Sequence, residues 1–241
     1  MKYNKENPLR VFTAFAGYDS QCLALERLKK IHPDFDYTLV GWSEFDPESN
    51  APIDKQPAVI AHKALFPDSA DKNYGDICKI DWSKVPDFDL FTYSFPCTDV
   101  SQAGKMLGLE KDSGTRSSLL WVCAKAIEEK KPKYLLMENV KNLVSNRFRG
   151  YFLDWQLYLE KQGYYSSGEI LNSKSYGVPQ NRERIFLVSI RIDDEDPLPR
   201  YTFPKPFPLE KHLIDVLEDE VDEKYFISDK MLSYFRRQHE D

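Results

Sequence analysis

The segment that most restricts how this 241-residue chain can fold is a short apolar run that ends in a proline and a cysteine. Residues 85–93 are rich in β-branched and aromatic side chains, and Pro86 and Pro96 bound the run. Such a run is typical of a buried parallel strand, and we expect its second half to form one. Cys97 then follows the carboxyl end of the strand, where open α/β sheets bind their ligands.

Two interpretations of Cys97 follow from this position. A lone cysteine is most often a small buried hydrophobic residue. The next segment, 98–116, favours a chemical role, because it is polar, rich in glycine and serine, and longer than most loops. Loops of this length are usually lids or binding loops, so we expect Cys97 to face a substrate.

The rest of the chain alternates between strand and helix patterns. Strands are expected at 10–15, 37–44, 134–137, 164–171 and 185–190, and helices near 21–31, 48–66, 117–130 and 150–163. The alternation predicts an α/β protein with a Rossmann-like, doubly wound and mostly parallel sheet. We expect a catalytic domain over residues 1–195, and a proline-rich linker with short helices near 209–217 and 228–237 over residues 196–241.

Composition narrows the classes of function. The net charge of −6 argues against strong nucleic-acid binding by the chain as a whole, so any contact with a polyanion must be local. No apolar run approaches the roughly 18 residues of a membrane span, and we expect a soluble cytoplasmic protein without a membrane partner. The four cysteines lack CxxC spacing, so neither a zinc site nor a disulfide framework is indicated.

Charged residues at the ends of the predicted strands are candidates for binding or catalysis. Glu44 follows Gly17 at a spacing at which nucleotide-binding folds place a carboxylate on ribose hydroxyls, although a solvated loop charge explains it equally well. Glu138 follows an apolar strand, and burial in the ligand-facing layer would raise its pKa towards that of a useful proton donor. Arg182 and Arg184 form either a solvated edge or a clamp for a carboxylate, carbonyl or phosphate.

With these pieces in order, the sequence resembles the cytosine-5 DNA methyltransferases, a family that uses S-adenosylmethionine as methyl donor. The resemblance covers residues 9–190 and the linker that follows. It rests on the order of six short segments, each weak alone: Phe15-Ala16-Gly17, Glu44, Gly75-Asp76-Ile77, Pro96-Cys97, Glu138-Asn139-Val140 and Gln180-Asn181-Arg182-Glu183-Arg184. It implies the fold of class I methyltransferases, double-stranded DNA as substrate, S-adenosylhomocysteine as product, no metal, and a place in a restriction-modification system.

The resemblance implies a set of catalytic residues. Cys97 adds its thiolate to carbon 6 of a cytosine extruded from the duplex, and Glu138 donates a proton to ring nitrogen 3. Arg184, helped by Arg182, holds the cytosine carbonyl oxygen and orients Glu138. The segment 98–116 closes over the base. Ser101, Lys105 and Arg116 are further expected contacts with the DNA or its target base. Asn139 and Gln180 are expected to support the catalytic residues.

The resemblance also implies a binding site for the methyl donor. Its expected members are Phe15, Ala16 and Gly17 on the methionine side, Glu44 at the ribose, Phe45, Asp76 and Ile77 at the adenine, and Pro96 and Leu119 as the remaining wall. The first turn also contributes Tyr18 and Asp19, and it departs from the family pattern, because Tyr18, Asp19 and Ser20 stand where further glycines are usual. Asp19 either pairs with the ammonium group of the donor or weakens binding, and the sequence favours neither.

Three features of the family do not occur in the sequence up to Asp241: a target-recognition domain, the Arg-rich segment that supports it, and a final Gly-Asn-[Ser/Ala]-Val helix. We therefore expect the catalytic portion of a truncated or split methyltransferase, to which a second polypeptide supplies the missing parts. Alone, the chain should fold, bind the donor weakly and methylate little.

Three alternatives stay open. A transfer-RNA cytosine-5 methyltransferase shares these residues but usually carries Cys-Phe-Thr, which the sequence lacks. A nicotinamide-dependent Rossmann protein requires G-x-G-x-x-G, which does not follow the first strand. A non-catalytic scaffold of the same fold is favoured by the altered first turn and disfavoured by the presence of Cys97, Glu138 and Arg184.

Overall fold

The structure is a computed structural model that describes residues 2–97, 118–194 and 196–237. Its contacts divide the chain into two units, Met1–Asn172 with Glu183–Lys205, and Ser173–Arg182 with Pro206–Asp241. The first unit holds the whole sheet and the helices that pack on it.

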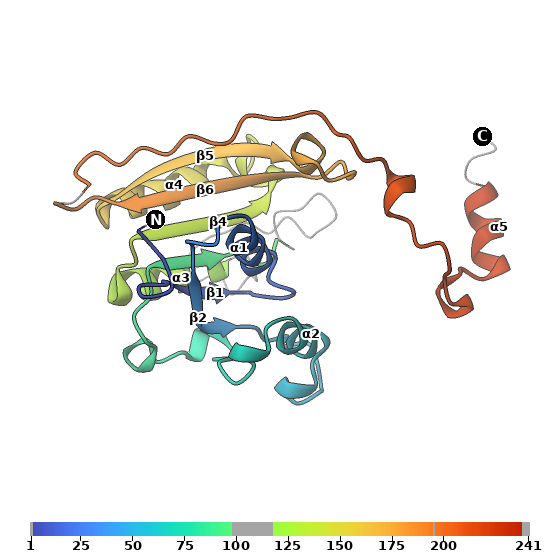
Figure 1. The fold of residues 1–241 in the computed structure, drawn as a ribbon, viewed down its shortest axis with the longest axis horizontal. Helices are drawn as coiled ribbons and strands as arrows, with labels where there is room; N and C mark the ends of the chain where they lie inside the picture. The colour runs from blue at the N-terminus through green and yellow to red at the C-terminus, as the bar shows by residue number, and fades with distance from the viewer. Residues whose placement is uncertain (1, 98–117, 195, 238–241) are drawn as a thin grey trace. The chain divides into compact units, whose positions relative to one another are not determined.

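Six strands form one sheet in the first unit (Figure 1). They are β1 (Leu9–Ala14), β2 (Tyr37–Ser43), β3 (Leu90–Tyr93), β4 (Tyr134–Val140), β5 (Tyr164–Asn172) and β6 (Glu183–Arg191), in the order β2-β1-β3-β4-β6-β5. Neighbours from β2 to β4 are parallel, and β6 runs antiparallel to both β4 and β5. The predicted Rossmann-like, mostly parallel sheet is therefore confirmed. Because strands are added on one side of β1 and then on the other, the carboxyl ends of β1 and β3 border the crevice where such sheets bind ligands.

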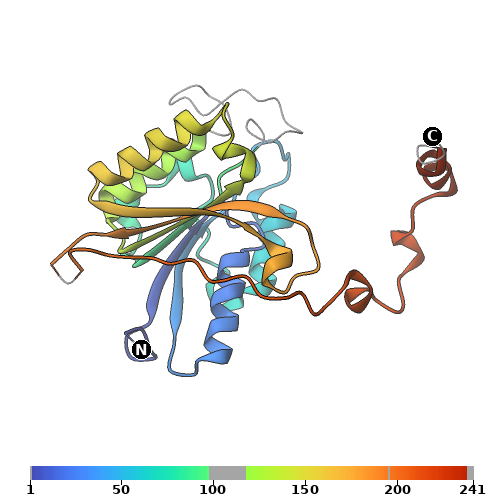
Figure 2. The same cartoon turned by 90° about the horizontal axis from the view of Figure 1, so that it is seen from above.

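Helices cover both faces of this sheet. Within the described part of the first unit they are α1 (Ser20–Ile31), α2 (Pro57–Leu65), α3 (Leu119–Lys130) and α4 (Arg149–Lys161). Figure 2 shows α3 and α4 on one face and α1 on the other. Val59 of α2 and Phe66 share a core with Cys22 of α1, so α2 lies on the α1 side.

The second helix begins later than its sequence suggested. It starts at Pro57, whose ring presets the backbone for the first helical position, and not near residue 48. Residues before it form a loop with one 3-10 turn, Ile53–Lys55. The buried side chain of Gln56 fastens this loop, since it accepts the Asp46 N–H at 2.9 Å and donates to the Asp46 carbonyl at 3.1 Å. The loop next to Phe45 is therefore held without a helix.

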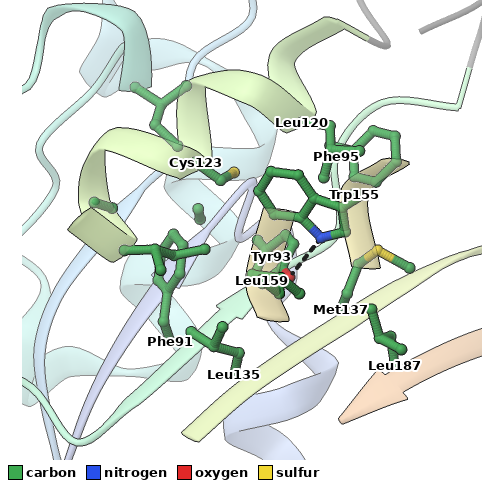
Figure 3. Close-up of a cluster of buried hydrophobic side chains, with 14 of the residues drawn as sticks. Phe91, Tyr93, Phe95, Leu120, Cys123, Leu135, Met137, Trp155, Leu159 and Leu187 are labelled. Atoms are coloured by element: carbon green, nitrogen blue, oxygen red, sulfur yellow. Dashed lines mark hydrogen bonds between the residues drawn. The ribbon is translucent and has the colours of Figure 1, made fainter. Parts of the chain in front are cut away.

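The core beneath α3 and α4 fixes the end of β3. Phe91, Tyr93 and Phe95 point into it together with Met137 of β4 and Trp155 of α4 (Figure 3). The Trp155 indole N–H donates to the Tyr93 hydroxyl at 3.2 Å, so the polar ends of both rings are satisfied inside an apolar layer. The segment that leads to Cys97 therefore follows a strand whose side chains are held in the core.

The second unit consists of 173–182 and the residues after Lys205. A 3-10 turn, Ser173–Tyr176, begins it, and the Phe207 N–H donates to the Ser175 carbonyl at 3.0 Å. Of the two short helices predicted here, 209–217 contains only a 3-10 turn, Leu213–Val216, whereas 228–237 forms α5 (Asp229–Arg237). Ser228 accepts the Met231 N–H at 3.4 Å and so helps to cap α5. Within the described ranges, no helix has the length and apolar composition needed to cross a membrane.

Candidate active site

Two of the residues expected to act on cytosine, Cys97 and Glu138, lie near the carboxyl ends of β3 and β4. These strands pair in parallel, with Tyr93 opposite Met137. The buried Asn139 donates its amide N–H to the Phe95 carbonyl at 3.0 Å, two residues before Cys97. This bond ties the segment that carries the thiol to the end of the strand that carries Glu138. Asn139, which the sequence analysis expects to support the catalytic residues, thus bonds to the segment that leads to Cys97.

Glu138 and Arg184 form an ion pair across neighbouring strands. Arg184 Nε lies 3.0 Å from Glu138 Oε1, and the two side chains are 23% and 20% exposed. In the antiparallel pairing of β4 with β6, Glu138 is opposite Phe186 and Val140 is opposite Arg184. Glu138 and Arg184 are thus diagonal neighbours on one face of the sheet, within reach of long side chains. The reversed direction of β6 brings the guanidinium of its second residue to the carboxyl end of β4.

The four cysteines differ in environment. Cys22 and Cys123 are fully buried, and burial raises the pKa of both thiols, as expected of structural residues. Cys78 is exposed, and its pKa is raised by partial burial and by the Asp76 carboxylate. Cys97 is partly buried and packs against the core under α3 and α4. Cys97 is therefore the cysteine that combines access with a position at the carboxyl end of β3.

A cavity of about 440 Å³ opens at the carboxyl ends of β1 and β2, within the size range of small-molecule sites. Seven residues expected to bind the donor line it: Phe15, Glu44, Phe45, Asp76, Ile77, Pro96 and Leu119. Ser43, Pro47, Gly75 and Cys78 also line it, and the sequence did not single them out as donor contacts. Pro96 precedes Cys97 directly, so the wall of the cavity continues into the thiol segment.

The first turn is held in a strained conformation. Phe15, Gly17 and Asp19 have φ values of 57°, 54° and 52°. Left-handed backbone costs a side-chain-bearing residue such as Phe15 roughly 1–2 kcal/mol, so the surroundings must fix it. The Gly17 N–H donates to Glu44 Oε2 at 2.7 Å. Glu44 therefore joins the first turn to the end of β2, and it is not a solvated loop charge.

Asp19 is buried inside the protein. Its side chain is 1% exposed and does not line the cavity. Oδ1 accepts the Cys22 N–H at 3.0 Å, which caps α1, and Oδ2 accepts from the Thr13 hydroxyl at 2.7 Å. The ring of the buried His62 lies 3.2 Å from the same Oδ2. The carboxylate thus points into the protein, where protein groups occupy both of its oxygens.

The remaining candidates lie elsewhere. Ala16 is buried in the core around α1, and Tyr18 is 66% exposed, so neither lines the cavity. Gln180 and Arg182 belong to the second unit, where their carbonyls accept from Ser173 Oγ at 2.9 and 3.3 Å. Ser101, Lys105 and Arg116, with the rest of segment 98–116, lie outside the described residues.

No group of three or more His, Cys, Asp or Glu side chains in the described part of the chain is arranged to hold a metal ion. The polar groups at the carboxyl edge are instead an ion pair, a thiol and the carboxylates of the cavity. This set suits proton transfer and nucleophilic addition.

Comparison with known proteins gives consistent results. The sequence matches the family model described as C-5 cytosine-specific DNA methylase over residues 9–241. It is 41% identical to the type II methyltransferase M2.ScrFI of Lactococcus lactis subsp. cremoris, over 93% of this chain and 72% of that protein. It is 38% identical to M1.ScrFI, a type II methyltransferase of the same organism, over 92% of this chain and 52% of that protein. The crystal structure of a Spodoptera frugiperda DNMT2 mutant aligns with a TM-score of 0.67 at 21% identity, over 95% of this chain and 65% of that chain.

Proposed function

The chain belongs to the C-5 cytosine-specific DNA methylase family, and we propose that it is the catalytic portion of an enzyme that methylates carbon 5 of cytosine in double-stranded DNA. The proposal rests on the Glu138–Arg184 ion pair, at a strand end that Asn139 ties to the Cys97 segment. The chain spans 72% and 52% of the two Lactococcus relatives, so the activity of a whole enzyme is part of the proposal.

Cys97 acts as the nucleophile. Carbon 5 of cytosine is a poor nucleophile until the ring becomes electron-rich. When the Cys97 thiolate forms a bond to carbon 6, the electron pair of the ring double bond moves to carbon 5 and the ring. Carbon 5 would take the methyl group from the donor, whose sulfur would keep the bonding electron pair and leave as the thioether S-adenosylhomocysteine. Carbon 5 would then lose its proton to solvent as the bond between carbon 6 and the Cys97 sulfur breaks, which returns the thiolate. The base must leave the duplex for this attack, because its reacting carbons are enclosed there.

Glu138 and Arg184 stabilise the charge that develops on the ring. The Glu138 carboxylate takes up a proton from solvent and donates it to ring nitrogen 3, and the guanidinium of Arg184 holds both the carboxyl group and the carbonyl oxygen of the base. The ion pair is only about one-fifth exposed, so its field is screened less than that of a surface pair. Glu138 therefore has a fixed orientation before the base arrives.

The cavity next to Pro96 fits the proposed methyl donor, S-adenosylmethionine. Phe15 and Phe45 offer aromatic surface, and the Glu44 and Asp76 carboxylates offer acceptors for hydroxyl and amino groups. The donor, when bound, supplies an electrophilic methyl group. Pro96 and Leu119 add apolar surface to the wall of the cavity.

The wider setting follows from the relatives. Both Lactococcus proteins are named type II methyltransferases, which supports a role in a restriction-modification system in the cytoplasm. We propose that a second polypeptide supplies target recognition. The net charge of −6 supports this, because a surface that reads DNA is expected to be basic.

Covalent trapping tests the proposal. A random-sequence duplex carrying 5-fluorocytosine is incubated with S-adenosylmethionine and the chain, alone and with the carboxyl-terminal part of M2.ScrFI as a second polypeptide. Fluorine cannot leave as a proton does, so the sulfur–carbon bond persists. We expect a denaturation-resistant adduct that Cys97→Ala abolishes and Cys123→Ala preserves. We expect Glu138→Gln to slow its formation about 10²- to 10⁴-fold, the usual range for a general acid.

Glu183→Gln is the matched control for Glu138→Gln. Glu183 is a neighbouring carboxylate, paired with Lys141 at 3.0 Å and 45% exposed, and its substitution should change the rate less than about twofold. Donor binding by calorimetry without any Cys97-dependent adduct, in either arrangement, would contradict the proposal and favour a scaffold.

A further inference from the structure

We propose that Asn73 is a positioning residue, which locks together the segments that form the donor cavity. The proposal rests on the function proposed above. Asn73 itself does not line the cavity, but its two hydrogen-bond partners, Glu44 and Gly75, do. Its side chain bonds to the backbone of both.

Three hydrogen bonds define the lock. Asn73 Oδ1 accepts the Glu44 N–H at 3.2 Å and the Gly75 N–H at 2.9 Å, and Nδ2 donates to the Glu44 carbonyl at 3.2 Å. Two partners only donate and the third only accepts, so one orientation of the amide satisfies all three. No other side chain of this length offers both an acceptor for two N–H groups and a donor.

The segment around Asn73 extends the sheet beyond β2. The Trp42 N–H donates to the Lys72 carbonyl at 3.1 Å, and the Tyr74 N–H donates to the Trp42 carbonyl at 2.8 Å. The Ser43 hydroxyl then donates to the Gly75 carbonyl at 2.6 Å. These bonds bring residues 72–75 alongside the end of β2, and the Asn73 amide continues the pairing to Glu44, after the strand has ended.

The lock reaches a third wall of the cavity through Glu44. The Glu44 carboxylate accepts the Gly17 N–H at 2.7 Å, so the first turn, the end of β2 and the Gly75–Asp76 segment are connected in series. Gly75 has a φ of 70°, which a residue with a side chain rarely adopts, and a Cβ there would lie 3.0 Å from Ile53. Its N–H bond to Asn73 holds this unusual backbone in place. Loss of Asn73 should therefore loosen all three walls.

Calorimetry with S-adenosylhomocysteine measures the consequence for binding, well below the melting temperature of each variant. Asn73→Ala removes all three bonds, each worth roughly a factor of two to twelve in an equilibrium constant. Because these bonds hold the cavity walls and do not touch the ligand, only part of their free energy appears in binding, and Kd should rise by about 10- to 100-fold. Asn73→Asp keeps two acceptor bonds but sets an anion against the Glu44 carbonyl, so it should fall between Asn73→Ala and wild type. Asn4→Ala is the matched control. Asn4 Oδ1 accepts the N–H groups of Glu6 and Asn7 at 2.9 and 3.0 Å, away from the cavity, and its loss should leave Kd unchanged.

Amide hydrogen exchange without ligand separates this proposal from the function it rests on. In Asn73→Ala the amides of Glu44, Gly75 and Gly17 should exchange at least about tenfold faster, while those of β3 keep their rates. An unchanged Gly17 amide, or an unchanged Kd despite a lower melting temperature, would overturn the positioning role. If wild-type protein does not bind S-adenosylhomocysteine, the donor site of the proposed function is refuted, and the exchange rates still decide the role of Asn73.

Discussion

At the scale of single residues, the candidate function of a polar side chain depends on whether it is buried with partners inside the protein or faces the cavity. Asp19 and Glu44 are both carboxylates that accept hydrogen bonds from the protein near the first turn, but the first is buried. The second lines the cavity. The thiols divide in a similar way, because Cys22 and Cys123 are enclosed and Cys78 is open to a cavity.

Cys78 offers a chemical probe of that cavity. Partial burial and the Asp76 carboxylate both disfavour the thiolate and raise its pKa, so maleimide labelling should reach half its maximal rate at a higher pH than for an ordinary cysteine. In the structure the Cys78 N–H donates to Asp76 Oδ1 at 3.0 Å, and an asparagine side chain can still accept this bond. Asp76→Asn therefore removes only the negative charge, and the pH midpoint of labelling should move to lower pH. Stopped-flow labelling across pH 7–11, with the site read by mass spectrometry, measures both midpoints. Equal midpoints in the two proteins would contradict this account.

At the scale of elements, the sequence predicted the strands and most helices but not the contacts between them. Apolar runs and prolines located β3 and β4, because local composition decides burial there. The start of α2 was misplaced, since Gln56 satisfies the preceding loop through one side chain, which no periodic pattern reveals. Asn73 was missed for the same reason. Its partner Glu44 lies 29 positions away, and such a contact has no local signal.

The first turn and α1 give a stability prediction. Asp19→Ala removes the cap of α1, leaves the buried His62 without its partner, and places alanine at a φ of 52°. The free energy of unfolding should fall by roughly 2–4 kcal/mol, which lowers the melting temperature by about 5–15 °C for a chain of this length. Asn tolerates this backbone and caps helices nearly as well, so Asp19→Asn should lose less than Asp19→Ala.

Differential scanning calorimetry of both variants checks this order. Ser20→Ala is the control, because Ser20 is exposed and, among the residues that the structure describes, its hydroxyl bonds to the Gln21 side chain, at 3.1 Å. Equal melting temperatures for Asp19→Ala and Ser20→Ala would show that the buried network does not stabilise the fold.

At the scale of the whole molecule, stability resides in the first unit. All residues of both core clusters lie between Leu9 and Leu187, and none of the described residues after Pro199 is buried. The later residues instead expose large apolar side chains, among them Ile214, Tyr225 and Phe226. A cluster of exposed apolar side chains along one segment favours association of that segment with another surface.

Deletion of residues 209–241 tests this division. The deletion keeps the Phe207–Ser175 bond and both core clusters, so the melting temperature should stay within about 2 °C of the full chain, as for other changes confined to the surface. Thermal unfolding followed by circular dichroism measures it, and light scattering should show less self-association. A markedly lower melting temperature would mean that the deleted residues stabilise the sheet.

Pro96 belongs to the wall of the cavity and is also bonded directly to the residue that carries the sulfur. Its pyrrolidine ring leaves the backbone at that point few ways to turn. Under the proposed function, the methyl donor and the target base would therefore meet the chain at two consecutive residues, Pro96 and Cys97. Occupancy of the cavity would then influence where the thiol can lie when the base arrives.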